Sequence, residues 1–236
     1  MPSSRTRLAA LQRLDRVPVV TLVLIVVIST VSAIGYVHPG VFEALERQRG
    51  AVADGQVWRL VTPLLVQTDG WKALLAVMWL LLVVGLVAEP LFGHARFLAL
   101  FLLAGMVGHS VGIVWQPGAG GASVGALGPA GALAALLLRP PGLGDPTARR
   151  VRPLGRLIGA AAVVIGVALL TGADIHGPAL LAGICLGFGL LALDPAVTRR
   201  RSGGRGFDEL AALGGGDAPV AGRPLAKPPR DVHGRR

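Results

Sequence analysis

Long apolar runs without charged residues constrain this chain more than any other feature of its sequence. The first run, Val17–Val37, has no Lys, Arg, Asp or Glu and is long enough for one helical crossing of a bilayer. Hydrophobic residues make up 53% of the chain and charged residues only 15%, which favours a protein that crosses a membrane several times. We therefore expect an all-α membrane protein with six transmembrane helices. The six runs are Val17–Val37, Ala73–Ala88, Phe97–Trp115, Val124–Leu138, Leu157–Ala173 and Ile175–Leu193.

These runs divide the chain into a membrane domain and two basic ends. We predict a basic leader at 1–16, a membrane domain at 17–198 with one long external loop at 38–72, and a tail at 199–236. The tail is rich in Gly, Pro and Arg and is predicted to be disordered, because it cannot bury enough apolar surface to order itself. The fourth run is short, and a soluble core helix is the alternative interpretation of it.

The basic residues are unequally distributed between the two sides of the predicted membrane domain. With six spans, 19 of the 23 Lys and Arg residues fall on the side that holds both termini. The positive-inside rule then predicts a multi-pass protein of the plasma (inner) membrane with both termini in the cytoplasm. This topology explains the net charge of +10 and favours membrane lipids as partners. Nucleic acid is not an expected partner, because no aromatic residues are interleaved with the basic ones.

Small residues recur at four-residue intervals in the last span, at Ala179, Gly183 and Gly187. The fourth span begins with a similar set that includes Gly125 and Gly128. Small side chains on one helix face let two helix backbones approach each other closely within a membrane. We therefore predict that the fourth and sixth spans contact each other along these two faces.

Four short segments form a second set of signals, which contain Gly, Trp, Arg, Glu or His at particular positions. One lies in the external loop, one follows the second span, and two begin the fourth and last spans. Any one of them is a weak signal, but their order and their coincidence with the spans make the set specific. They are Gly55–Thr62 (G-Q-V-W-R-L-V-T), the pair Glu89 and Arg96, Val124–Gly128 (V-G-A-L-G), and His176 with Ala179 and Gly183.

Together these segments resemble the rhomboid family of intramembrane serine proteases. The resemblance implies a six-transmembrane-helix rhomboid-like bundle in which Trp58, Arg59, Glu89 and Arg96 have structural roles. It implies no cofactor. The sequence also lacks a metal-binding motif of the H-E-x-x-H type or a cysteine cluster, so no metal is predicted.

In this family a G-x-S-G motif supplies the nucleophile and a later histidine supplies the base. By that resemblance His176 occupies the base position and Leu127 the serine position. Leu127 has no hydroxyl group to attack a carbonyl carbon. Ala73 and Val77, at the positions of two oxyanion donors of the family, cannot donate side-chain hydrogen bonds. We therefore predict a catalytically inactive member, a pseudoprotease that binds transmembrane segments of other membrane proteins.

Several alternatives stay open at the level of the sequence. Ser123 lies one helical turn before Leu127 and is a candidate substitute nucleophile, in which case the chain is an active intramembrane serine endopeptidase. His176 is alternatively a polar cap at the start of a helix, beside Asp174. His109 is explained sufficiently as a neutral histidine bonded to a neighbouring helix. A channel or transporter is the third class, although such proteins more often carry charged residues or broken helices within their spans.

Overall fold

The computed structural model describes residues 17–138 and 146–193, with the backbone alone for 146–152. The predicted leader at 1–16 and the predicted tail at 199–236 lie outside the described residues. Both therefore stay predictions.

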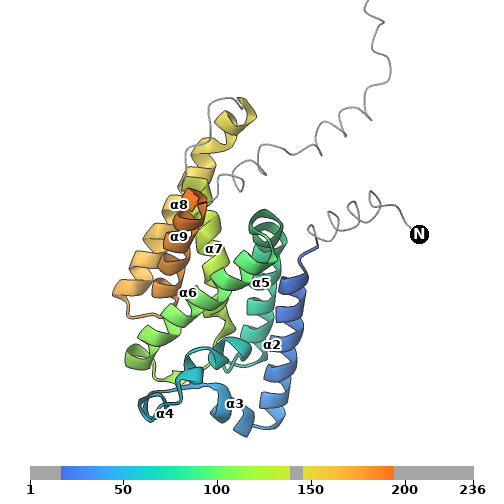
Figure 1. Cartoon of the computed structure of the whole chain (residues 1–236), viewed down its shortest axis with the longest axis vertical. Coiled ribbons are helices and arrows are strands. Elements are labelled where there is room, and N and C mark those ends of the chain that lie inside the picture. The colour runs from blue at the N-terminus through green and yellow to red at the C-terminus, as the bar shows by residue number, and fades with distance from the viewer. Residues whose placement is uncertain (1–16, 139–145, 194–236) are drawn as a thin grey trace, which may run out of the picture. The chain divides into compact units, whose positions relative to one another are not determined.

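All six apolar runs form helices, which pack side by side (Figure 1). Five of them are long and apolar enough to cross a membrane, and the sixth, α7, is an apolar helix of 17 residues. The prediction of a helical, multi-pass membrane domain is confirmed. The helices are α2 (Val19–Val37), α5 (Trp71–Phe92), α6 (His94–Trp115), α7 (Ala122–Leu138), α8 (Pro146–Thr171) and α9 (His176–Leu193).

The short helix α7 lies at the centre of the bundle, where it contacts α5, α6, α8 and α9 (Figure 1). Backbone atoms take part directly in its contact with α9. A Cβ atom added at Gly183 would lie only 2.4 Å from the carbonyl oxygen of Gly128, and one added at Gly187 would lie 2.6 Å from Cα of Ala132. Gly125 faces α6 instead, where a Cβ atom would lie 2.7 Å from the ring of Phe101. A short helix is stable here because its neighbours shield it from lipid.

The predicted external loop is a folded segment of short helices that also contains one strand of a small sheet. Arg59 is buried in it and donates hydrogen bonds to the carbonyl oxygens of Glu43 and Glu46 and to Oε1 of Gln56. The neighbouring Trp58 is exposed. The elements are α3 (Gly40–Leu45), β1 (Arg47–Gln48), α4 (Arg49–Ala53), the 3₁₀ helices η1 (Val57–Leu60) and η2 (Thr62–Leu65), and β2 (Gly118–Ala119), which pairs antiparallel with β1.

Glu89 joins the end of α5 to the start of α2. Its carboxylate accepts hydrogen bonds from the backbone N–H groups of Val20 and Thr21, both at 2.8 Å, and from Oγ1 of Thr21 at 2.5 Å. His94 contacts the same carboxylate at 2.5 Å. The first N–H groups of a helix lack acceptors within the helix, so Glu89 caps α2.

Candidate active site

Ser123 and His176 meet where two helices begin. Ser123 is the second residue of α7 and His176 the first residue of α9. The Ser123 Oγ atom lies 2.8 Å from Nε2 of His176, which is a hydrogen-bond distance. The two residues are 53 positions apart in the chain, so only the packing of α7 against α9 brings them together. A serine hydroxyl within hydrogen-bond reach of a histidine is the arrangement of an activated nucleophile.

Asp174 contacts the other side of the histidine ring. Its Oδ1 atom lies 2.6 Å from Nδ1 of His176 and also accepts a hydrogen bond of 2.9 Å from the His176 backbone N–H. Burial tends to raise the pKa of Asp174, but the hydrogen bonds and the charge interaction with His176 outweigh it, so that this pKa lies below its usual value. Asp174 is therefore a carboxylate at neutral pH.

The carboxylate of Asp174 determines which ring nitrogen of neutral His176 carries the hydrogen. A carboxylate only accepts hydrogen bonds, so Nδ1 must be the protonated nitrogen. Nε2 then presents a lone pair to the hydroxyl group of Ser123. This is the tautomer that a general base needs in order to remove the hydroxyl proton.

The segment before α7 is held in place by the external segment. The backbone N–H of Ala122 donates to the carbonyl oxygen of Val66 at 3.1 Å, Thr68 N–H donates to Gly120 O at 3.2 Å, and Gln67 pairs with Gly121. These bonds form a short ladder immediately before Ser123. The ladder restricts the backbone at the start of α7 and so keeps the hydroxyl group within reach of His176.

The pair is partly exposed at the surface of the bundle. The side chains of His176 and Asp174 are 36% and 37% exposed, and Ser123 is partly exposed. Both helices begin here, so the pair lies near one end of the bundle and away from its middle.

Leu127 occupies a different environment. It lies one turn further along α7, is partly buried, and packs against Val124, Ile175 and Ala179. The hydrogen bond to His176 comes from Ser123. The resemblance places Leu127 at the serine position of the motif. In the structure, Ser123 is the residue that contacts His176.

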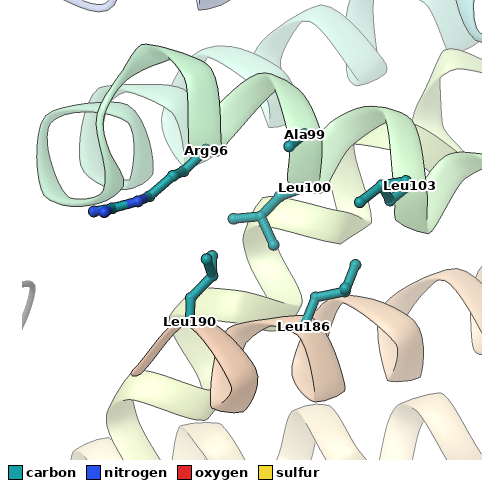
Figure 2. Close-up of a pocket in the computed structure, with 6 residues that line it drawn as sticks. All are labelled: Arg96, Ala99, Leu100, Leu103, Leu186 and Leu190. Carbon is teal, nitrogen blue, oxygen red and sulfur yellow. The ribbon is translucent and has the colours of Figure 1, made fainter. Parts of the chain in front are cut away.

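Two apolar hollows lie elsewhere on the described surface. One lies between α6 and α9, where five apolar side chains and the stem of Arg96 surround it (Figure 2). Arg96 is 13 residues before His109 in the same helix. The hollow is therefore about 20 Å from His109 along the helix axis. The other hollow lies between α5 and α7 and is lined by Val87, Leu91 and three leucines of α7. Neither hollow is lined by Ser123 or His176.

A comparison with protein-family models supports the overall resemblance. The model of the rhomboid domain matches residues 54–195, which is more than half of the chain. The chain belongs to the rhomboid family. The match begins directly after α4 and ends just beyond α9, so this rhomboid domain contains both Ser123 and His176. No curated protein matches the chain.

The sequence contains a signal for this serine that the alignment on Leu127 passes over. Gly121-Ala122-Ser123 already fits the first three positions of the rhomboid G-x-S-G motif, and only the fourth position, Val124, departs from it. An alignment on Gly125 and Gly128 matches both glycines of the motif but places Leu127 at the position of the serine. Asp174, two residues before His176, is a second residue of the set that lies close to another member in the sequence.

Proposed function

We propose that this rhomboid-family protein is an intramembrane serine endopeptidase in which Ser123 is the nucleophile and His176 the general base. The observation that carries the proposal is the 2.8 Å hydrogen bond between Ser123 Oγ and His176 Nε2. The hydrogen bond from His176 Nδ1 to Asp174 supports the same assignment, because it holds the histidine in the required tautomer.

The proposed reaction proceeds in two steps. In the first, His176 takes the proton of the Ser123 hydroxyl while Oγ attacks the carbonyl carbon of the scissile peptide bond. The protonated His176 then gives this proton to the leaving amine, and an acyl-enzyme remains on Ser123. In the second step His176 deprotonates a water molecule that attacks the ester carbon. The acid product leaves, and the proton returns to Ser123.

The start of α7 supports the negative charge that develops on the attacked carbonyl oxygen. Ser123 lies in the first turn of this helix, where backbone N–H groups have no acceptor within the helix. The positive end of the helix dipole also points toward this end. Both features favour a tetrahedral oxyanion next to the nucleophile.

The proposed substrate class is a membrane protein whose peptide chain reaches the ends of α7 and α9. We place this end on the external side of a plasma (inner) membrane, with both chain termini in the cytoplasm, because of the distribution of basic residues. The basic ends of the chain are expected to attract anionic lipid head groups, and transmembrane segments of other proteins are the expected partners.

A second candidate function, the binding of transmembrane helices without catalysis, is favoured by one specific observation. Ala73 and Val77, at the family positions of two oxyanion donors, have no side-chain hydrogen-bond donor. An active enzyme needs another source of such donors, because each one contributes about 10²–10³ in turnover. A pseudoprotease needs none.

Cleavage of a reporter separates the two functions. The full chain is reconstituted in liposomes with a single-span fluorescent substrate, and Ser123→Ala, His176→Ala and Leu127→Ser are compared with the wild type. We expect cleavage by the wild type, loss of it in the two alanine variants by several powers of ten, and no gain from Leu127→Ser. Ser110→Ala is the matched control, because that hydroxyl bonds only to the Met106 carbonyl within its own helix. A folded wild type that cleaves nothing, or a Ser123→Ala variant that still cleaves, contradicts the proposal.

A further inference from the structure

A buried polar cluster joins the external segment to α6. It consists of Arg47 from β1, His109 from α6 and the carbonyl group of Gln116, which accepts hydrogen bonds from Nε and Nη2 of Arg47. Arg47 and His109 are both fully buried. A Cβ atom at Gly112 would lie 2.7 Å from Cζ of Arg47, so the guanidinium group lies directly against α6. The cost of burying such groups is offset only when their hydrogen bonds are made.

Arg47 determines which nitrogen of His109 carries the hydrogen. Nη1 of Arg47 lies 2.5 Å from Nδ1 of His109, and arginine only donates hydrogen bonds. Nδ1 must therefore be the acceptor, and neutral His109 carries its hydrogen on Nε2. The ring also hydrogen-bonds to the backbone of Gly121, and Nε2 has no other partner among the described residues. Since Nε2–H is the donor that remains on the ring, its acceptor is the carbonyl oxygen of Gly121.

The peptide group between Gly121 and Ala122 is thereby held on both sides. Its carbonyl oxygen accepts hydrogen bonds from His109 and, at 3.3 Å, from the backbone N–H of Val124. Its N–H donates to the carbonyl oxygen of Val66 at 3.1 Å. The C=O and N–H of a trans peptide group point in opposite directions. Contacts with α6 on one side and with the external segment on the other therefore fix the orientation of this peptide plane.

This peptide group lies directly beside the proposed nucleophile. The Cβ position of Gly121 is 3.4 Å from Oγ of Ser123, so a tilt of the backbone at Gly121 changes the immediate surroundings of the hydroxyl group. The same turn of α6 packs against both helices of the proposed site. A Cβ atom at Gly108 would lie 2.4 Å from Val124 Cγ1 and 3.0 Å from the carbonyl oxygen of Ile175. The cluster therefore contacts the chain where α7 and α9 begin.

We propose that Arg47 and His109 are positioning residues for the nucleophile Ser123. They act by fixing the peptide group before it, which keeps the hydroxyl within reach of the catalytic histidine. The inference rests on the proposed peptidase function. Neither side chain touches substrate, because both are fully buried, so their effect passes through the backbone. A misplacement of about 1 Å in a catalytic group costs about 10²-fold in rate, so a fixed backbone here matters for the reaction.

The first test is reporter cleavage by the full chain in liposomes, with kcat and KM measured separately. His109→Gln keeps both hydrogen bonds, because the glutamine oxygen accepts from Arg47 and the glutamine nitrogen donates to Gly121. His109→Leu keeps neither and leaves Arg47 without this partner, so the double variant Arg47→Met/His109→Leu, which has no buried charge, is measured beside it. We expect the leucine and double variants to lose about 10²-fold in kcat with little change in KM. The glutamine variant should recover most of the loss.

The second test needs no substrate. The rate at which a serine-directed fluorophosphonate probe modifies Ser123 depends on the alignment of the hydroxyl with its base. We expect this rate to fall in the leucine and double variants and to recover in His109→Gln, at a temperature where all variants are folded. Ser110→Ala, at the next position of α6, is the matched control and should behave as the wild type does.

The outcomes separate this inference from the proposed function. If the wild type cleaves through Ser123 and the folded double variant cleaves and is labelled equally fast, the positioning role is wrong and the peptidase stands. Equal losses in the glutamine and double variants, or losses that follow the melting temperature, assign the cluster a purely structural role and also overturn the proposal. Failure of both the leucine and the double variant to fold has the same meaning. Absence of Ser123-dependent cleavage in the wild type overturns both the inference and the proposed function.

Discussion

The contact between α7 and α9 differs in kind from the contact between α2 and α5. In the first, glycines bring backbone against backbone, as Gly183 lies against Gly128. In the second, side chains mediate the approach: the three atoms nearest to a Cβ atom at Gly85 all belong to the side chain of Thr21, and the carboxylate of Glu89 caps α2. Backbone atoms cannot move aside as a side chain can. The helices α7 and α9, which carry Ser123 and His176, are therefore fixed relative to each other. The helices α2 and α5 are held together by side chains, which a substitution can change without moving the backbone.

The largest effect is expected from a bulky residue at the inner contact. Gly183→Leu would place a Cβ atom 2.4 Å from the carbonyl oxygen of Gly128, which can move only if the whole of α7 shifts. We expect a loss of stability of about 3 kcal/mol or more, the upper part of the range for overpacking, and a loss of cleavage with it. The melting temperature in detergent measures the effect. Gly189→Leu in the same helix is the matched control, because a Cβ atom there has nothing within 4 Å. Equal melting temperatures for the two variants would show that the helices are not in close contact.

The outer contact should depend on one side chain. Glu89→Gln keeps the shape of Glu89 but removes its charge and one of its two acceptor oxygens, so either the N–H of Val20 or the N–H and hydroxyl of Thr21 lose their acceptor. We expect about 2 kcal/mol less stability, because hydrogen bonds to charged groups contribute about 1.5–3 kcal/mol. Thr21→Val removes only the hydroxyl bond and should cost less. Thermal unfolding ranks the two variants, and a larger effect for Thr21→Val contradicts the proposed cap.

A smaller effect is expected at Asp174, which orients His176 while the helix contact fixes its backbone. Asp174→Asn should lower kcat about tenfold, far less than in proteases with a fully buried triad, because Asp174 is partly exposed. Reporter cleavage measures this loss, and Asp174→Glu should retain more activity than the asparagine variant. Unchanged kcat in Asp174→Asn would remove Asp174 from the mechanism.

The lowered pKa of Asp174 also predicts how the stability of the protein changes with pH. The pKa of Asp174 is lowered in the folded protein, so its contribution to stability is complete above the unfolded value of about 3.9 and disappears as pH falls through the folded value. Any difference in melting temperature between wild type and Asp174→Asn should therefore be small at neutral pH and vanish in acid. A difference that grows as pH falls from 6 toward about 3 has the wrong sign.

The smallest effect is expected at Gly166 of α8, whose Cβ position faces a flexible side chain of α9. A Cβ atom at Gly166 would lie 2.9 Å from Cδ2 of Leu181, the far end of a side chain that can rotate away. Gly166→Ala should change stability by less than about 1 kcal/mol, since the higher helix propensity of alanine offsets the crowding. Gly131→Ala is the comparison within the inner contact, because its Cβ atom would lie 2.5 Å from the Leu180 carbonyl oxygen. Similar melting temperatures for both variants would remove the distinction between the two kinds of contact.

The sequence predicts the helices well because a bilayer imposes their length and composition. The run at 124–138 and the helix α7 at Ala122–Leu138 differ by two residues at one end. The spacing of Ala179, Gly183 and Gly187 predicts the face of α9 that lies toward α7, since four residues bring a helix nearly back to the same side. The fold of the external segment is not predictable in this way. Its ladder with Gly120 and Ala122 joins segments more than 50 residues apart and is made by backbone groups, which have no sequence signature.

The site shows the limit of motif alignment more sharply. Glycine positions around Leu127 satisfy a packing requirement of α7 as well as a catalytic motif, so they cannot identify the nucleophile by themselves. Ser123, His176 and Asp174 become a set only when the starts of α7 and α9 lie side by side. The sequence does not indicate the hydrogen bond between His109 and Arg47, because the two residues come from separate elements, α6 and β1. It forms only because β1 is buried against α6.

Labelling with a serine-directed fluorophosphonate probe tests the central claim most directly. Such a probe forms a bond only with a serine whose hydroxyl is activated by a base. The full chain in native-like membranes is treated with the probe, and the modified peptide is located by mass spectrometry. The proposed site predicts modification at Ser123 that is lost in Ser123→Ala and His176→Ala and unchanged in Leu127→Ser. A folded wild type that takes up no probe while Leu127→Ser is labelled at residue 127 would contradict it.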